Sequence, residues 1–114
     1  MRNATRISGK EARRSAPIFA ALGDETRLRM LSRLAQSGPM SITSLTAGTG
    51  VTRQAVTKHL RRMEYAGLLQ ASRLGRERVW EVDPASLDMA EQYLRTISDQ
   101  WDAALGRLKA FVES

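Results

Sequence analysis

Residues 52–69 constrain the fold more than any other stretch, because they have the features of a complete amphipathic helix. The apolar side chains of one face recur at helical spacing, at Ala55, Val56, Leu60 and Met63. Thr52 suits the N-cap, where its hydroxyl can accept from a free amide of the first turn, and Gly67 tolerates the left-handed backbone that ends many helices. We therefore predict a helix over about residues 52–66 with one buried face.

The opposite face of this predicted helix is basic. It carries Arg53, Gln54, Thr57, Lys58, Arg61 and Arg62, with His59 near its edge. Arginine and glutamine can form paired hydrogen bonds with base edges, whereas lysine and threonine suit phosphate oxygens. No acidic residue precedes Glu64 within the helix to repel a DNA backbone. The pattern favours a recognition helix for duplex DNA, and the alternative is an ordinary amphipathic helix whose charges face water.

The composition limits the classes of protein to which this chain can belong. Its 114 residues suit one domain with one modest core. The sequence has no apolar run long enough to cross a bilayer and no hydrophobic signal peptide, so we expect a cytoplasmic protein. Cysteine is absent, which excludes disulfides and thiolate chemistry. The formal net charge of +6 and the pI of about 10.7 favour a polyanionic partner.

The distribution of charge indicates two different sides of the molecule. Residues 1–14 hold five basic side chains and one acidic, and residues 52–78 hold seven basic and two acidic. Residues 85–114, in contrast, hold three basic and five acidic side chains. A protein with a DNA-facing side and a separate assembly side would have this asymmetry.

The segment before the recognition helix predicts a tail and two helices. Residues 1–15 are polar and basic, so we expect a mobile arm that either adds phosphate contacts or is a passive tail. Pro17 suits the first turn of a short apolar helix that ends at Gly23. Asp24 suits the N-cap of a second helix, which ends at Gly38-Pro39. The expected buried residues of the second helix are Leu28, Leu31, Leu34 and Ala35, and its other faces mostly carry Arg27, Arg29 and Arg33.

A short third helix precedes the recognition helix. Ser41 can cap it, and Ile42, Leu45 and Ala47 are expected to face inward. The run Gly48-Thr49-Gly50 then forms a tight turn, followed by the apolar Val51. Two short helices joined by a glycine-containing turn, the second of them basic, are the arrangement of a helix-turn-helix.

After Gly67 the pattern changes to that of a β-hairpin, which predicts a wing over about residues 68–82. β-Branched and aromatic residues surround the expected turn Gly75-Arg76-Glu77. The arginines of this hairpin can contact a phosphate strand or enter a minor groove; they are Arg73, Arg76 and Arg78. Alternatively, these charges keep an exposed sheet edge soluble.

The last helix, expected over about residues 85–113 after Pro84, carries the longest periodic pattern. Its heptad seam consists of Leu87, Ala90, Leu94, Ile97, Trp101, Ala104, Leu108 and Phe111. One small core cannot cover so long a seam, so we expect the same helix of a second subunit to do so in a two-fold dimer. The expected interface residues are Leu87, Leu94, Ile97, Trp101, Leu108 and Phe111. The alternative is a helix folded back over its own domain, and Met89, Tyr93 and Leu105 can dock on the first helix.

Three stretches of the chain, in order, resemble one known family. Residues 18–31, IFAALGDETRLRML, resemble the opening signature of the ArsR/SmtB-type winged-helix repressors. The run VTKHL at residues 56–60, with Met63, Gly67, Leu68 and Leu69, resembles the recognition-helix signature of that family, and GRERVW at residues 75–80 resembles its wing. The resemblance implies a homodimeric repressor that binds an inverted-repeat operator. It places Gln54, Thr57 and Lys58 nearest the bases or the adjacent backbone, and Thr52, His59, Arg61 and the wing arginines at phosphates.

The chain departs from the family pattern at the metal sites. Many members sense metals through a cysteine pair on the third helix or through Asp, His and Glu side chains on the last helix. Here the third helix reads SITSLT, the last helix lacks histidine, and the resemblance places the single histidine, His59, at the DNA face. We therefore expect no metal and no cofactor, and thiol redox sensing is excluded. A small molecule in the dimer interface and a protein partner both stay open as the inducing signal.

These observations predict a mainly α, winged helix-turn-helix fold of about five helices plus a β-hairpin wing, dimerising through the C-terminal helix, with residues 16–114 as one domain. The predicted function is sequence-specific DNA binding by a homodimeric repressor. The alternatives are a winged-helix protein-interaction module and a non-specific nucleic-acid-binding protein, although little aromatic surface is available for base stacking. The sequence shows neither a nucleophile–His–carboxylate order nor a glycine-rich phosphate loop, so we do not expect an enzyme.

Overall fold

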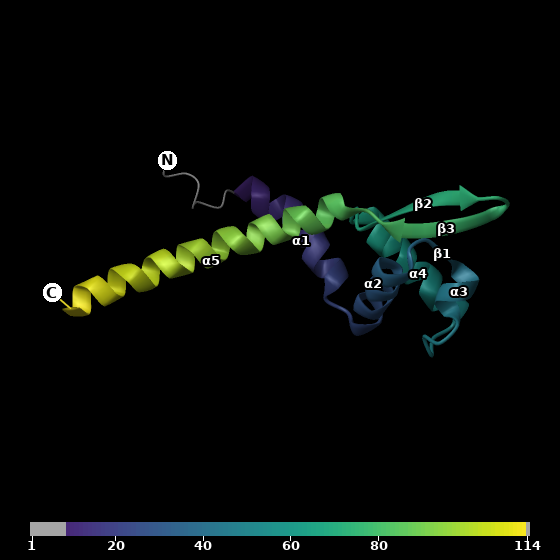
Figure 1. Cartoon of the computed structure of the whole chain (residues 1–114), viewed down its shortest axis with the longest axis horizontal. Coiled ribbons are helices and arrows are strands. Elements are labelled where there is room, and N and C mark those ends of the chain that lie inside the picture. Colours follow the sequence, from purple (N-terminus) through teal and green to yellow (C-terminus); the bar gives the residue numbers. More distant parts are fainter. Residues whose placement is uncertain (1–8, 114) are drawn as a thin grey trace.

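Five helices and one three-stranded antiparallel sheet make up residues 9–113, the part of the chain that the computed structural model describes (Figure 1). In chain order the elements are α1 (Gly9–Leu22), α2 (Glu25–Ser37), β1 (Met40–Ser41), α3 (Ile42–Thr46), α4 (Arg53–Tyr65), β2 (Leu69–Leu74), β3 (Glu77–Val82) and α5 (Pro84–Glu113). A hairpin follows directly after α4, which confirms the predicted winged helix-turn-helix arrangement. No described helix is long and apolar enough to span a membrane.

Three helices begin at the capping residues that the sequence predicts. The side chains of Asp24, Ser41 and Thr52 accept hydrogen bonds from backbone amides three residues ahead, over 3.0, 3.1 and 3.1 Å. Each bond satisfies one free amide of a first helical turn, which fixes where α2, α3 and α4 start. Gly67, just beyond α4, has the expected left-handed backbone with a φ of 81°.

Helix α1 begins earlier than the sequence predicts. It starts at Gly9, and Pro17 lies inside it rather than in its first turn. The expected boundary of a mobile arm at residue 15 is therefore wrong for residues 9–15, and the rest of that arm, residues 1–8, lies outside the described residues. Tertiary packing explains the difference, because Ser15 is buried and the ring of Phe19 lies 5.9 Å from that of Tyr93 on α5.

The sheet has the strand order β1-β3-β2, with both pairs antiparallel. The β2–β3 pairing extends to Leu74 opposite Glu77, so Gly75 and Arg76 alone form the turn. Glu77 is therefore a strand residue, not the turn residue that the sequence suggested. Strand β1 was not predicted, because its two residues are too few to show an alternating pattern.

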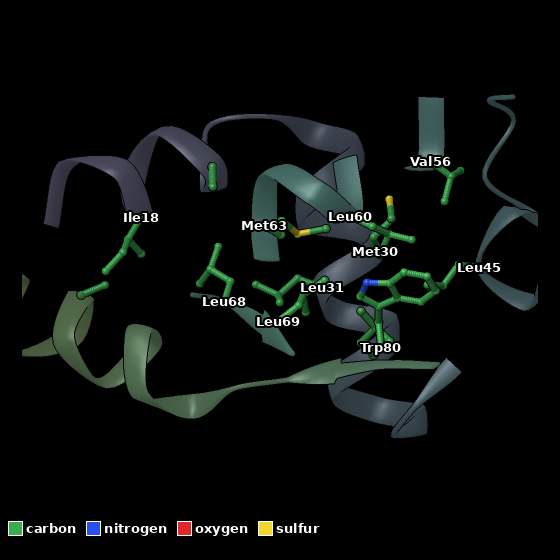
Figure 2. Close-up of a cluster of buried hydrophobic side chains, with 13 residues drawn as sticks. Ile18, Met30, Leu31, Leu45, Val56, Leu60, Met63, Leu68, Leu69 and Trp80 are labelled. Carbon is green, nitrogen blue, oxygen red and sulfur yellow. The ribbon is translucent and has the colours of Figure 1, made fainter. Parts of the chain in front are cut away.

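The core lies where α2, α3, α4 and the hairpin meet, and Figure 2 shows its side chains. Its large side chains that are at most 2% exposed are those of Met30, Leu34, Leu45, Val56, Leu60, Met63, Leu68 and Leu69. Trp80 reaches into this cluster from β3 and is 8% exposed. Its indole Nε1 is buried and has no hydrogen-bond partner among the described residues. The apolar face of α4 thus packs inward as predicted, although Ala55 is only half-buried.

Helix α5 extends well beyond the other elements (Figure 1), and the whole molecule, α5 included, measures 67 Å along its longest axis. Near its start, Leu87 and Ala90 join the core. Farther along, the seam is uncovered, with Leu94, Ile97, Trp101, Leu108 and Phe111 between 42% and 79% exposed. The helix does not fold back over its own domain, and Leu105, which we expected to dock on α1, is 44% exposed.

Candidate nucleic-acid interface

Helices α3 and α4 are joined by a tight turn and by a side-chain hydrogen bond. Gly48 and Gly50 have φ values of 80° and 74°, a backbone region that favours glycine. At the start of α4, Nη1 of Arg53 donates to Oγ1 of Thr43 on α3 over 3.2 Å. Together these features hold the two helices in contact, as a helix-turn-helix requires.

Helix α4 has a buried face and a basic face, as predicted. Its exposed side chains include those of Arg53, Gln54, Lys58, Arg61 and Arg62, and Thr52 at the N-cap is also exposed. Thr57 is half-buried, and its hydroxyl donates to the carbonyl of Arg53 over 2.9 Å. Because that proton is engaged within the helix, the lone pairs of the Thr57 hydroxyl remain available to accept a hydrogen bond.

His59 is half-buried, and its Nδ1 lies 3.3 Å from Nη1 of Arg27 on α2. Arg27 is only 7% exposed, whereas Leu28 is 48% exposed, so the expected placement of Arg27 on an outer face and of Leu28 in the core is wrong. The buried residues of α2 are Arg27, Met30, Leu31 and Leu34. Their spacing is helical and could have identified Arg27 as buried from the sequence.

The wing carries its three arginines on exposed positions. Arg73 and Arg78 lie directly opposite each other in the β2–β3 register, and Arg76 is at the turn. The guanidinium of Arg78 also lies 5.1 Å from the ring centroid of Trp80, a cation–π distance. Like charges opposite each other repel, so a phosphate group between Arg73 and Arg78 would stabilise this arrangement.

The carboxylate of Asp24 lies close to Arg27 and His59. The backbone amide of Arg27 donates to this carboxylate, and this bond is the main reason that the pKa of Asp24 lies below its ordinary value. The positive charges of Arg27 and His59 lower that pKa further, against an opposing effect of burial. The stability contributed by this cap is present above the ordinary aspartate pKa and is lost as the pH falls through the lowered value.

No three His, Asp or Glu side chains within residues 9–113 are grouped so that they could hold a metal ion. The charged side chains on α4 and the wing are instead arranged along one exposed helix face and one hairpin. A helix-turn-helix with a basic second helix and a basic wing defines the class of winged helix-turn-helix DNA-binding domains.

Comparisons with known proteins place the chain within that class more closely. Residues 22–70 match a family model described as a helix-turn-helix domain. The chain is 35% identical over 97 residues to the HTH-type transcriptional regulator Rv2034 of Mycobacterium tuberculosis, covering 84% of this chain and 86% of the relative. It is 40% identical over 68 residues to the HTH-type transcriptional regulator YuzN of Bacillus subtilis, itself uncharacterised, covering 54% of this chain and 74% of the relative.

Solved structures agree with these relatives. An ArsR-like transcriptional regulator from Rhodococcus sp. RHA1 superposes with a TM-score of 0.80 at 35% identity, over 91% of this chain and 96% of that structure. The AntR antimony-specific transcriptional repressor superposes with a TM-score of 0.63 at 35% identity, over 85% of this chain and 88% of that structure. The chain belongs to the ArsR family of winged helix-turn-helix proteins and is a DNA-binding transcriptional regulator.

Proposed function

We propose that the protein is a homodimeric repressor that occludes an inverted-repeat operator. The observation that carries this proposal is the separation of an exposed basic face on α4 from an uncovered apolar seam on α5. In a two-fold dimer the two α4 helices would enter successive major grooves, roughly 34 Å apart along the DNA. The dimer would thereby set the spacing of the two half-sites, and DNA occupied in this way is blocked to other proteins.

Each half-site is contacted by two groups of side chains. Gln54, Thr57 and Lys58 meet base edges or the adjacent backbone, since they lie on the outer face of the first turns of α4. Phosphates are contacted by Thr52, Arg53, His59, Arg61 and Arg62 on α4 and by Arg73, Arg76 and Arg78 on the wing.

Dimerisation rests on the exposed apolar residues of α5. Trp101 and Phe111 are 63% and 79% exposed in one subunit, and large aromatic side chains left in water forgo the free energy of burial. Leu94, Ile97 and Leu108 continue the same seam at heptad spacing, so a second copy of α5 can bury the whole row.

Repression is the expected outcome of binding, and one relative at 35% identity is itself an antimony-specific repressor. The 114 residues contain no cysteine, so antimony or a similar thiophilic ion is not the signal that we expect here. The inducing signal is instead a small molecule or a protein partner. We place the action of the regulator in the cytoplasm, where it meets its operator, and we assign it no catalysed reaction.

The test is to capture genomic fragments with the purified protein at near-physiological salt, starting with the region upstream of its own gene. Enrichment of an inverted repeat supports a dimeric, sequence-specific regulator, because two half-sites are required by the two-fold axis. Uniform retention of all fragments, lost as salt rises, would contradict the proposal and leave only charge-driven binding. No retention at any salt would favour a protein-interaction module instead.

A further inference from the structure

Arg27 is a buried cation on α2, outside the helix-turn-helix formed by α3 and α4. It is 7% exposed, its Nε donates to the carbonyl of Ala21 over 2.6 Å, and its Nη2 donates to the carbonyl of Ala20 over 3.3 Å. Both carbonyls lie in the last turn of α1, which has no basic residue of its own. The guanidinium therefore donates to two carbonyls at the negative end of α1, one of which, that of Ala20, also accepts from the amide of Gly23, and these bonds compensate for the removal of the charge from water.

The third contact of this guanidinium reaches the recognition helix. Nη1 of Arg27 lies 3.3 Å from Nδ1 of His59, and arginine can only donate hydrogen bonds. Nδ1 must then be the acceptor, so in the neutral imidazole the proton resides on Nε2. The contact selects the tautomer of His59 that keeps an N–H donor available at the other side of the ring.

These two side chains line a cavity of about 390 Å³, together with Lys58 and Arg62 of α4. All four lining residues are basic types, and none is acidic. Asp24, which also interacts with Arg27 and His59, has its carboxylate bonded to the backbone amide of Arg27. A cavity with this lining attracts an anion and is large enough for a tetrahedral phosphate group.

We propose that this cavity binds one backbone phosphate of the operator, with Lys58 and Arg62 as its exposed cations, the Nε2–H of His59 as a donor, and Arg27 as the positioning residue that fixes the His59 ring. The inference rests on DNA binding by α4 and adds Arg27, a residue of α2, to the machinery of recognition. It also links the C-terminal turn of α1 to a DNA contact, because Arg27 donates hydrogen bonds both to that turn and to His59.

The first experiment measures affinity against salt concentration for a duplex that the wild-type protein retains. Arg62→Gln is expected to lower the slope of log K against log salt by about 1 and to weaken binding across sequences. Arg29→Gln is the matched control, because Arg29 is an exposed arginine of α2 that pairs with Glu25 and does not line the cavity. If Arg62→Gln and Arg29→Gln change the slope equally, the cavity is not a phosphate site. If the wild-type protein retains no duplex, the proposed repressor function fails instead.

Replacing single phosphates of that duplex by neutral methylphosphonates identifies the contact. One methylphosphonate position per half-site should weaken DNA binding by the wild-type protein. The same replacement should not further lower the DNA affinities of Arg62→Gln and Lys58→Gln, which are already weakened. The inference is overturned if every methylphosphonate weakens the variants as much as it weakens the wild type. Both variants change exposed side chains, so they test the site without disturbing the core.

The second experiment uses His59 as a probe, since it is the only histidine in the chain. At about pH 8, where imidazole is ordinarily neutral, ¹⁵N NMR of the free wild-type protein should show a single tautomer protonated at Nε2. Arg27→Lys, which retains the charge but not the three-way donor geometry, should give a mixture of tautomers and weaker DNA binding with an unchanged salt slope, because a neutral His59 donor releases no counterion. A mixture in the wild-type protein would contradict the positioning role whether or not the variant folds.

The same spectrum distinguishes two sources of phosphate. Addition of the duplex should shift the His59 resonances, and inorganic phosphate at equal phosphate concentration should leave them unchanged. A full shift with inorganic phosphate alone, with no further change when duplex is added, would contradict the assignment to DNA.

Discussion

At the scale of single residues, Gly67 is constrained both by its backbone and by its neighbours. Its φ is 81°, and a Cβ built there would lie 2.6 Å from Oγ of Ser86. That hydroxyl is held in place because it donates to the carbonyl of Ala66 over 3.1 Å. The sequence identified the first constraint, since glycine commonly follows a helix end, but it could not reveal the second.

Gly67→Ala should therefore destabilise the fold more than glycine replacement at an open turn. Gly75→Ala is the control, because Gly75 has a φ of 66° and open space where a Cβ would lie. Backbone strain alone predicts a loss of about 1–2 kcal/mol for Gly75→Ala, and Gly67→Ala should exceed it in thermal or urea unfolding. Adding Ser86→Ala to Gly67→Ala should recover the difference, and equal losses for the two glycines would contradict the steric argument.

Arg61 tests phosphate contacts on α4 more directly than Arg53 does. Arg53 also donates to Thr43, so its replacement disturbs the turn between α3 and α4, whereas Arg61 is exposed and forms no hydrogen bond to α3 within residues 9–113. Arg61→Ala should weaken DNA binding at low salt. The difference in affinity from the wild-type protein should shrink as salt rises, because the variant neutralises one phosphate fewer and releases fewer counterions on binding. Anisotropy titrations at three salt concentrations measure this; an equal loss at all salts would mean that Arg61 does not contact a phosphate.

At the scale of elements, the sequence predicts those whose signals are local. Helix α4 and the hairpin were found because Thr52, Gly67 and the apolar periodicity around them act within one element. The early start of α1 was missed because it depends on α5, which is far away in sequence. Arg27 was misplaced for a different reason. Its position on α2 has the spacing of a buried residue, but a charged side chain is rarely assigned to a core, and the groups that contact it lie on α1 and α4. Non-local contacts therefore decided where α1 begins, whereas the pattern on α2 already contained the position of Arg27.

Two arginines of the wing should separate DNA binding from stability. Arg76 lies at the exposed turn, whereas Arg78 covers the ring of Trp80. Arg76→Gln should weaken DNA binding and leave thermal stability unchanged, since nothing packs on an exposed turn cation. Arg78→Gln should weaken binding and also destabilise the fold, by about 0.5–1 kcal/mol for an exposed cation–π contact. Paired DNA titrations and unfolding curves of the two variants test this, and an unchanged stability for Arg78→Gln would mean that the Trp80 contact does not outweigh the repulsion between Arg78 and Arg73.

At the scale of the whole molecule, charge and apolar surface are placed at opposite ends. The arginines of α4 and the wing lie at one end of the molecule, and the exposed seam of α5 extends toward the other (Figure 1). One end can therefore bind DNA while the other assembles, so that assembly does not compete with the operator for the same side chains. Coupling between the two ends can run through α1, which contacts Tyr93 on α5 and, through its last turn, Arg27 on α2.

Trp101 gives the most direct test of assembly. It is 63% exposed on the seam of a single α5, so Trp101→Asp should place a charge in the proposed interface and yield a monomer by light scattering. Leu74→Asp is the matched control, because Leu74 is 69% exposed on the wing, away from α5, and its replacement should leave the dimer intact. Dimers from both variants would mean that the α5 seam does not hold the subunits together.

The fluorescence of Trp101 also reports on dimerisation, without introducing a charge at the interface. Only two tryptophans are present, and Trp80→Phe leaves Trp101 as the single tryptophan while removing a buried N–H that has no acceptor within residues 9–113. Its emission should be blue-shifted at high protein concentration, where a partner helix buries the indole, and should move to the red on dilution as the dimer dissociates. If the emission stays at the wavelength of exposed indole at concentrations where light scattering reports a dimer, the subunits associate through another surface. The half-site spacing on the operator would then be set by that surface instead of by α5.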